Sequence, residues 1–168
     1  MSESSVKYIT PPNNLRKKQI AAGVALTIDP SLIGAAETKI GSMKGEYLSW
    51  VGGDLDKLAA ACDLAVKDKD NRAKHVEDLY NKAVEIKGQG GSFGFPLMTT
   101  VGSQLCRFIE IQGNNLDDPK MDIVKLHVET LRLVIQQKME GEGGAMGQKL
   151  LTGLSLAIKK VTEPKQGA

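Results

Sequence analysis

The sequence is poor in aromatic residues, which make up only 4% of its 168 residues. Its apolar volume comes instead from Ala, Leu, Val, Ile and Met. These residues suit helices that pack at short distances, and Ala, Leu and Met are themselves good helix formers. No segment shows the alternating pattern of an amphipathic strand. The composition therefore predicts a helical protein before any motif is considered.

An excess of charge of one sign is also lacking. Lys and Arg number 22 against 20 for Asp and Glu, which gives a net charge of +2, and the charges are spread along the chain. We therefore expect no nucleic-acid partner. No apolar run approaches the roughly 18 residues that a membrane span requires, and residues 1–5 lack the apolar core of a signal peptide. We expect a cytoplasmic protein with no membrane partner.

Cysteine and histidine are scarce, with two residues of each. Cys62 and Cys106 fall on the apolar faces of predicted helices, where a small buried thiol is the usual interpretation. There is no Cys-x-x-Cys pair, and His75 and His127 are widely separated, so the sequence gives little support for a metal site. We expect neither a metal ion nor a small-molecule cofactor.

Apolar residues recur at spacings of three and four along most of the chain, which is the pattern of amphipathic helices. Start signals are Asp29 with Pro30, and Asp117 or Asp118 with Pro119. Gly52 and Gly53 are expected to interrupt or bend their helix, because two glycines cost about 2 kcal/mol of helix propensity relative to alanine. We predict helices over residues 15–22, 30–41, 45–67, 72–90, 96–113, from about 118 to at least 135, and 145–161.

Residues 83–94 read Ala-Val-Glu-Ile-Lys-Gly-Gln-Gly-Gly-Ser-Phe-Gly, which is more glycine than a stable helix contains. The spacing matches neither common glycine-rich nucleotide-binding motif, and no strand precedes it. We expect Gly88 and Gly90 to let a partner or a neighbouring helix approach the backbone. Gly94 is expected to allow a turn before Pro96, which suits the first turn of a helix.

This stretch resembles the signature of histidine-containing phosphotransfer (HPt) domains, roughly Ala-His-x-Leu-Lys-Gly followed by a hydrophobic residue and a glycine. The resemblance extends loosely over residues 28–138. It implies an all-α fold, an antiparallel four-helix bundle of HPt type, here with extra N- and C-terminal helices. We accordingly divide the chain into an N-terminal extension with a short helix (1–27), an HPt-like domain (28–162) and a C-terminal tail (163–168).

Val84 stands where the family has its phosphorylated histidine, and an isopropyl group cannot accept a phosphoryl group. Helix geometry places Val84 at the border between the apolar face and solvent, with Lys87 and Gly88 one turn further on. The resemblance implies that Lys87 attracts the acidic pocket of a receiver domain and that Gly88 lets the receiver come close. The partner-binding residues that it implies are Val84, Lys87, Gly88, Gln89, Gly91 and Ser92.

We therefore expect a protein of two-component signalling, a pseudo-phosphotransferase that binds a response-regulator receiver domain or a sensor histidine kinase. It is not expected to be an enzyme at the usual site. One alternative is an active phosphotransfer protein with a relocated acceptor, His127, which has to be accessible to solvent. His75 is a poorer replacement, because it lies on the opposite side of the same helix from Val84. The other alternative is a purely structural or oligomerising helical bundle.

Overall fold

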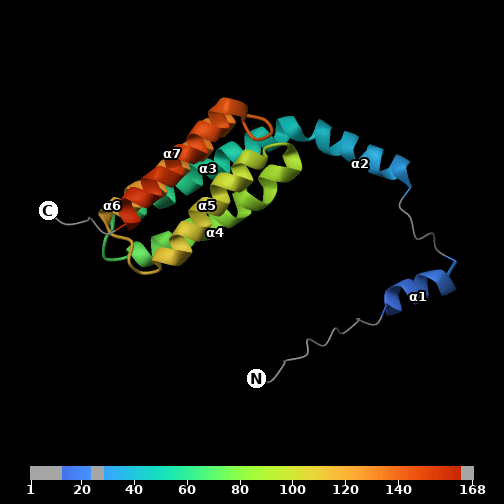
Figure 1. The fold of residues 1–168 in the computed structure, drawn as a ribbon, viewed down its shortest axis with the longest axis horizontal. Helices are drawn as coiled ribbons and strands as arrows, with labels where there is room; N and C mark the ends of the chain where they lie inside the picture. Colours follow the sequence, from blue (N-terminus) through green and yellow to red (C-terminus); the bar gives the residue numbers. More distant parts are fainter. Residues whose placement is uncertain (1–12, 24–28, 164–168) are drawn as a thin grey trace, which may run out of the picture. The chain divides into compact units, whose positions relative to one another are not determined.

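The structure is a computed structural model that describes residues 13–23 and 29–163. These residues are helical with no strand among them, which confirms the predicted all-α class (Figure 1). Each predicted helix is present, and its stated ends lie within one residue of those observed. The helices are α1 (Asn14–Ala21), α2 (Pro30–Ser42), α3 (Lys44–Lys67), α4 (Arg72–Gly90), the short 3-10 helix η1 (Gly91–Phe93), α5 (Pro96–Gln112), α6 (Asp118–Gln136) and α7 (Gly144–Thr162).

The chain divides into two units between residues 39 and 40, inside α2. No residue of α1 or α2 is buried, and all described core residues belong to the second unit. At the start of α2 the Asp29 carboxylate accepts a hydrogen bond from the Ser31 amide at 2.9 Å, as expected for a capping residue. The predicted boundary at residues 27 and 28, residues 1–12, and residues 164–168 of the predicted tail lie outside the described residues.

The second unit is built around four helices that each contact two of the others. Both α3 and α5 pack against α4 and against α6, and α7 packs on α6 and α5. Neighbouring helices run antiparallel: Thr99 of α5 bonds to Lys87 of α4, whereas Glu110, later in α5, bonds to Tyr80, earlier in α4. The largest fully buried apolar side chains are Tyr47, Leu58, Leu79, Ile86, Phe95, Leu97, Met98, Leu105, Met121 and Leu131.

Arg72 joins two connecting segments at one end of this unit. Its Nε donates a hydrogen bond to the Ala65 carbonyl at 2.9 Å, and its two terminal nitrogens donate to the Leu116 carbonyl at 2.8 Å and to Asp118 at 2.6 Å. One side chain therefore fixes the end of α3, the start of α4 and the link between α5 and α6. Hydrogen bonds to a charged group are worth about 1.5–3 kcal/mol.

The predicted interruption of α3 at Gly52 and Gly53 is wrong. The helix continues through Gly52 and Gly53 to Lys67. Val51 and Leu55, on either side of the two glycines, are both buried in the core. Burying two large aliphatic side chains stabilises a structure by about 1.5–3 kcal/mol each, which outweighs the low helix propensity of the glycines.

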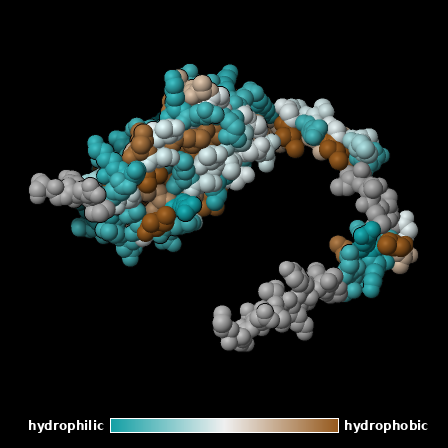
Figure 2. Space-filling view, in the orientation of Figure 1, coloured by the Kyte–Doolittle hydropathy of each residue, from teal (hydrophilic) through white to brown (hydrophobic). Residues whose placement is uncertain are grey.

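The surface of the second unit carries both hydrophobic and hydrophilic side chains. Hydrophobic side chains form separate patches among hydrophilic ones on the face shown in Figure 2. Cys62 and Cys106 are buried free thiols, as predicted, and burial raises the pKa of Cys62 to about 11. Within residues 13–23 and 29–163, no helix is long and apolar enough to cross a membrane.

Gly90 and Gly94 shape the connection between α4 and α5. Gly94 has a φ of 85°, in the left-handed region that favours glycine, which confirms the predicted turn before Pro96. A Cβ atom at Gly90 would lie 2.7 Å from the Cβ of Met98 and 2.9 Å from the carbonyl oxygen of Phe95. The missing side chain of Gly90 therefore serves a neighbouring helix, whereas a Cβ at Gly88 would meet nothing within 4 Å.

These two glycines of α4 make a matched pair for measuring stability. We expect Gly90→Ala to lower the free energy of unfolding by about 1–3 kcal/mol, because the new methyl group collides with α5. Gly88→Ala is expected to raise it by up to about 1 kcal/mol, because alanine has the higher helix propensity and the space is open. Urea denaturation followed by circular dichroism measures both. A Gly90→Ala variant as stable as Gly88→Ala would contradict the close approach of α5.

Candidate functional site

The residues implied as partner-binding lie at the C-terminal end of α4 and in η1. At 100° per residue, Lys87, Gly88 and Gly91 fall within about 60° of Val84 around the helix. We call the face formed by Val84, Lys87, Gly88 and Gly91 the α4 surface. Val84 is 37% exposed, as expected for a residue at the border with solvent. Gly88 and Gly91 are exposed, and Lys87 is half-buried.

The structure does not bring all six residues onto this face. Gln89 is exposed but lies about 140° around the helix from Val84. Ser92 is exposed in η1, about 80° from Val84 by the same count. A partner that covers Val84 and Lys87 therefore reaches Ser92 at the edge of the contact, and Gln89 faces another direction.

Lys87 is held by the packing of α4 against α5. A Cβ atom at Gly102 of α5 would lie 3.0 Å from the Cβ of Lys87 and 3.3 Å from its Cα. The backbone of Lys87 therefore lies directly against α5. No salt bridge of the described residues involves Lys87. Its positive charge remains available to an acidic partner.

Thr99 joins the end of α4 to η1. Its hydroxyl donates a hydrogen bond to the Lys87 carbonyl at 2.9 Å and accepts one from the Gly91 amide at 3.0 Å. The Phe95 amide also donates to the Gly90 carbonyl at 2.8 Å. These contacts fix the last turn of α4 to the start of α5, so the α4 surface has a defined backbone.

Sequence reasoning missed the two α5 residues that position this surface, Thr99 and Gly102. For Gly102 a signal was present, because a glycine in the middle of an apolar helix often marks a close backbone approach. Thr99 carried no comparable signal. A threonine near the start of a helix is common, and its two partners belong to other elements.

An aromatic stack packs η1 against α3. The Phe93 ring lies parallel to the ring of Tyr47 with a centroid separation of 4.3 Å and an interplanar angle of 10°. Tyr47 is fully buried, and burial raises its pKa to about 12, so it stays neutral. Lys44 pairs with Glu140 at 2.7 Å, with its Nζ 5.4 Å from the ring centroid of Phe95. Contacts of Phe93 and Phe95 with α3 therefore hold the chain on both sides of the turn at Gly94.

The α4 surface offers contacts rather than a nucleophile. Val84 is chemically inert, and the two glycines have no side chain. The nearby thiol of Cys106 is buried, and burial raises its pKa, which disfavours the reactive thiolate. Tyr80 donates a hydrogen bond to Glu110, which raises the pKa of the phenol. The arrangement is suited to binding.

His127 is fully buried in α6. Its ring Nδ1 donates to the Ile123 carbonyl at 2.7 Å, and its ring centroid lies 6.4 Å from that of Phe108. The Nε2 atom is buried without a hydrogen-bond partner in the described residues. Burial lowers the pKa of this imidazole, which favours the neutral form. The solvent accessibility that a relocated phospho-acceptor requires is absent from this structure.

His75 lies near the start of α4, with its Nε2 3.0 Å from the carboxylate of Asp68. Nine residues separate it from Val84, which corresponds to more than about 13 Å along the helix axis. Neither histidine therefore belongs to the α4 surface. Within the described residues, no group of three or more His, Cys, Asp or Glu side chains is placed to hold a metal ion.

Comparisons with known proteins do not assign a function, so the proposal below is based on the geometry of the α4 surface. No family model matches the chain, and no match was found among curated proteins or among solved structures.

The buried imidazole of His127 predicts a specific pH dependence of stability. Its folded-state pKa is lowered, so below about pH 6.5 the unfolded chain takes up a proton that the folded chain does not. The resulting stability is present above that pH and is lost as the pH falls towards the folded-state pKa. In the wild type we expect the free energy of unfolding to fall by up to about 1.4 kcal/mol for each pH unit in this range. We expect the His127→Gln variant to lack this decrease.

Urea denaturation at several pH values between about 7.5 and 5.5 measures this effect. His75→Gln is the control, because it removes the other histidine and is expected to retain the loss. A wild-type pH dependence identical to that of His127→Gln would show that His127 is protonated as readily in the folded chain as in the unfolded one.

Proposed function

We propose that this chain is an HPt-like protein of two-component signalling that binds a receiver domain or a histidine kinase through the α4 surface. It does not accept phosphate at Val84. In this proposal α3, α4, α5 and α6 are the antiparallel four-helix bundle of HPt type, and the remaining helices are additions to it. The antiparallel packing of these four helices and the placement of Val84, Lys87 and Gly88 on one exposed face support the proposal.

The observation that carries the proposal is the position of Gly88. This residue is exposed in the interior of a helix, and a Cβ added there would meet nothing within 4 Å. The fold therefore has no need of a glycine at this point, although glycine costs about 1 kcal/mol of helix stability relative to alanine. An approaching partner provides a reason, because the missing side chain lets another backbone come close.

Open space alone does not mark a site, since a Cβ added at Gly52, Gly53 or Gly153 would meet nothing within 4 Å either. The α4 surface differs in the support that it receives. The hydrogen bonds of Thr99 and the packing on Gly102 hold the backbone beside Gly88 in a fixed position. A pre-formed surface binds with a smaller entropy cost than a mobile one.

Lys87 and Val84 supply complementary contributions to such a contact. The ammonium group of Lys87, which forms no salt bridge with the described residues, attracts an acidic pocket and speeds the encounter. The half-exposed isopropyl group of Val84 gains from leaving water when a partner covers it. A nucleophile is dispensable for both effects, so the loss of the histidine removes the chemistry and leaves the binding contacts.

The two alternatives receive less support. Transfer through His127 requires α6 or its neighbours to move, because the ring is fully buried. A structural or oligomerising role through α7 requires a continuous apolar face. Its most exposed apolar residues, Met146 and Leu156, are separated by about 15 Å along the helix and about 80° around it. These two residues do not form one patch.

The first test of the proposal is binding. We expect at least one receiver domain or histidine kinase of the same organism to bind the purified chain in isothermal titration calorimetry. Lys87→Glu and Gly88→Gln are each expected to weaken that complex by about tenfold or more, through charge reversal and steric blocking.

Lys149→Glu and Gly153→Gln make the same changes on exposed positions of α7 and serve as matched controls. They are expected to leave the affinity unchanged. An equal loss in the α7 variants, or no binding by any receiver or kinase, would contradict docking at the α4 surface.

The second test restores the missing nucleophile. After incubation with phosphorylated receiver domains, we expect no acid-labile phosphate on the wild-type chain and a gain of label on Val84→His. His75→Ala and His127→Ala are examined alongside. Wild-type label that disappears in His127→Ala would establish a relocated acceptor, and absence of label on every variant would favour the structural alternative.

A further inference from the structure

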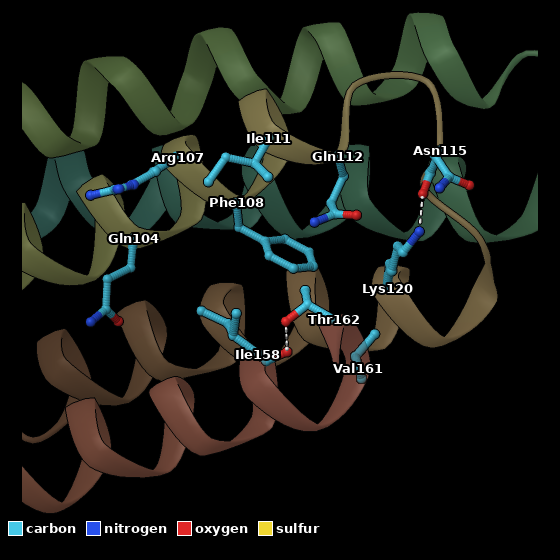
Figure 3. Close-up of a pocket in the computed structure, with 10 residues that line it drawn as sticks. All are labelled: Gln104, Arg107, Phe108, Ile111, Gln112, Asn115, Lys120, Ile158, Val161 and Thr162. Atoms are coloured by element: carbon cyan, nitrogen blue, oxygen red, sulfur yellow. Dashed lines mark hydrogen bonds between the residues drawn. The ribbon is translucent and has the colours of Figure 1, made fainter. Parts of the chain in front are cut away.

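A pocket lies between the second half of α5, the start of α6 and the end of α7 (Figure 3). No residue of the α4 surface lines it. Its volume is about 600 Å³, within the range of roughly 300–1,000 Å³ that is usual for small-molecule sites. Nothing in the docking function proposed above makes use of it.

The middle of the pocket is apolar. The ring of Phe108 projects from α5 towards α7, where Ile158 and Val161 line the opposite wall (Figure 3). Phe108 is almost completely buried, whereas Ile111 is 67% exposed and lines the pocket further along α5. An aromatic floor with an aliphatic wall suits a hydrocarbon body.

The charged residues that line the pocket are all basic: Arg107 and Lys120, with no Asp or Glu. Lys120 is partly neutralised, because its ammonium donates to the Asn115 carbonyl at 2.7 Å and lies 3.9 Å from a carboxylate oxygen of Asp117. Arg107 forms no salt bridge with the described residues. The free positive charge of the pocket is therefore that of Arg107.

A second polar group accompanies this charge. Gln104, three residues earlier in α5, lies at the same end of the pocket as Arg107, with Lys120 at the other end (Figure 3). The Oε1 atom of Gln104 is buried without a hydrogen-bond partner in the described residues. A half-turn of this amide presents N–H donors in place of the oxygen. One end of the pocket thus combines a free guanidinium with an unsatisfied amide.

We propose that this pocket binds a small carboxylic acid with an apolar body. The carboxylate meets Arg107 and the turned amide of Gln104, and the body lies over Phe108 against Ile158 and Val161. A guanidinium matches the two oxygens of a carboxylate geometrically. A phosphate monoester carries a second charge for which this end of the pocket has no second free cation.

Decanoate is a suitable probe, with 1-decanol and decyl phosphate as its neutral and doubly charged counterparts. In isothermal titration calorimetry on the full chain, we expect decanoate to bind with one site per chain and about tenfold more tightly than either counterpart. Arg107→Gln removes the free charge, and Ile111→Glu adds a carboxylate at an exposed lining position. Each is expected to weaken decanoate binding by about tenfold.

The matched controls lie on α7 outside the pocket. Lys149→Gln removes the same charge, and Leu156→Glu, at a residue that is 62% exposed, adds the same carboxylate. Both are expected to bind decanoate as the wild type does. The proposal is overturned by a wild type that does not bind decanoate, by Arg107→Gln and Ile111→Glu variants that bind it unchanged, or by equal losses in the α7 controls. Binding of decanol or decyl phosphate as tight as that of decanoate would overturn the carboxylate assignment.

Discussion

Two glycines set the distance between α4 and α5, one on each helix. Gly90 leaves room for Met98 and the Phe95 carbonyl, and Gly102 leaves room for the backbone of Lys87. Protein interiors are packed closely enough that a single added methyl group at either point has to displace its neighbours. The close approach that results also lets the hydroxyl of Thr99 reach across to α4. The geometry of the α4 surface therefore depends on a contact between backbones, made inside the molecule.

The same helix α5 serves two features on different sides. Gly102 faces α4, whereas Gln104 and Phe108 lie about 160° and 120° around α5 from it and line the pocket against α7. Helix α5 thus supports the α4 surface on one side and the pocket on the other. Variants that separate the two features therefore avoid the buried positions of α5. A change at a buried α5 position alters both features at once.

The fold was largely predictable because its signals are local. Apolar spacing, Pro96 and the Asp117 cap place the helices almost to the residue, since each signal acts within one or two turns of the chain. The continuity of α3 and the contact of Gly102 with Lys87 depend on packing between helices, which local propensity does not contain. The candidate site shows the same limit. Gln89 lies two residues after Lys87 in the sequence, but the helix directs Gln89 away from the face that contains Val84.

In the function proposed above, Val84 stands at the position of the HPt histidine, which separates two requirements that an HPt site normally combines. Phosphoryl transfer needs a nucleophile, whereas docking needs apolar area, unpaired charge and room for a partner's backbone. In this proposal Val84, Lys87 and Gly88 provide the second set, on a face that the fold holds in place. An alanine at position 88 would strengthen α4 without touching any neighbour among the described residues, so this part of the fold does not require the glycine. In the proposed function, a partner that approaches this backbone accounts for the glycine. The same partner accounts for the charge of Lys87, which forms no salt bridge with the described residues.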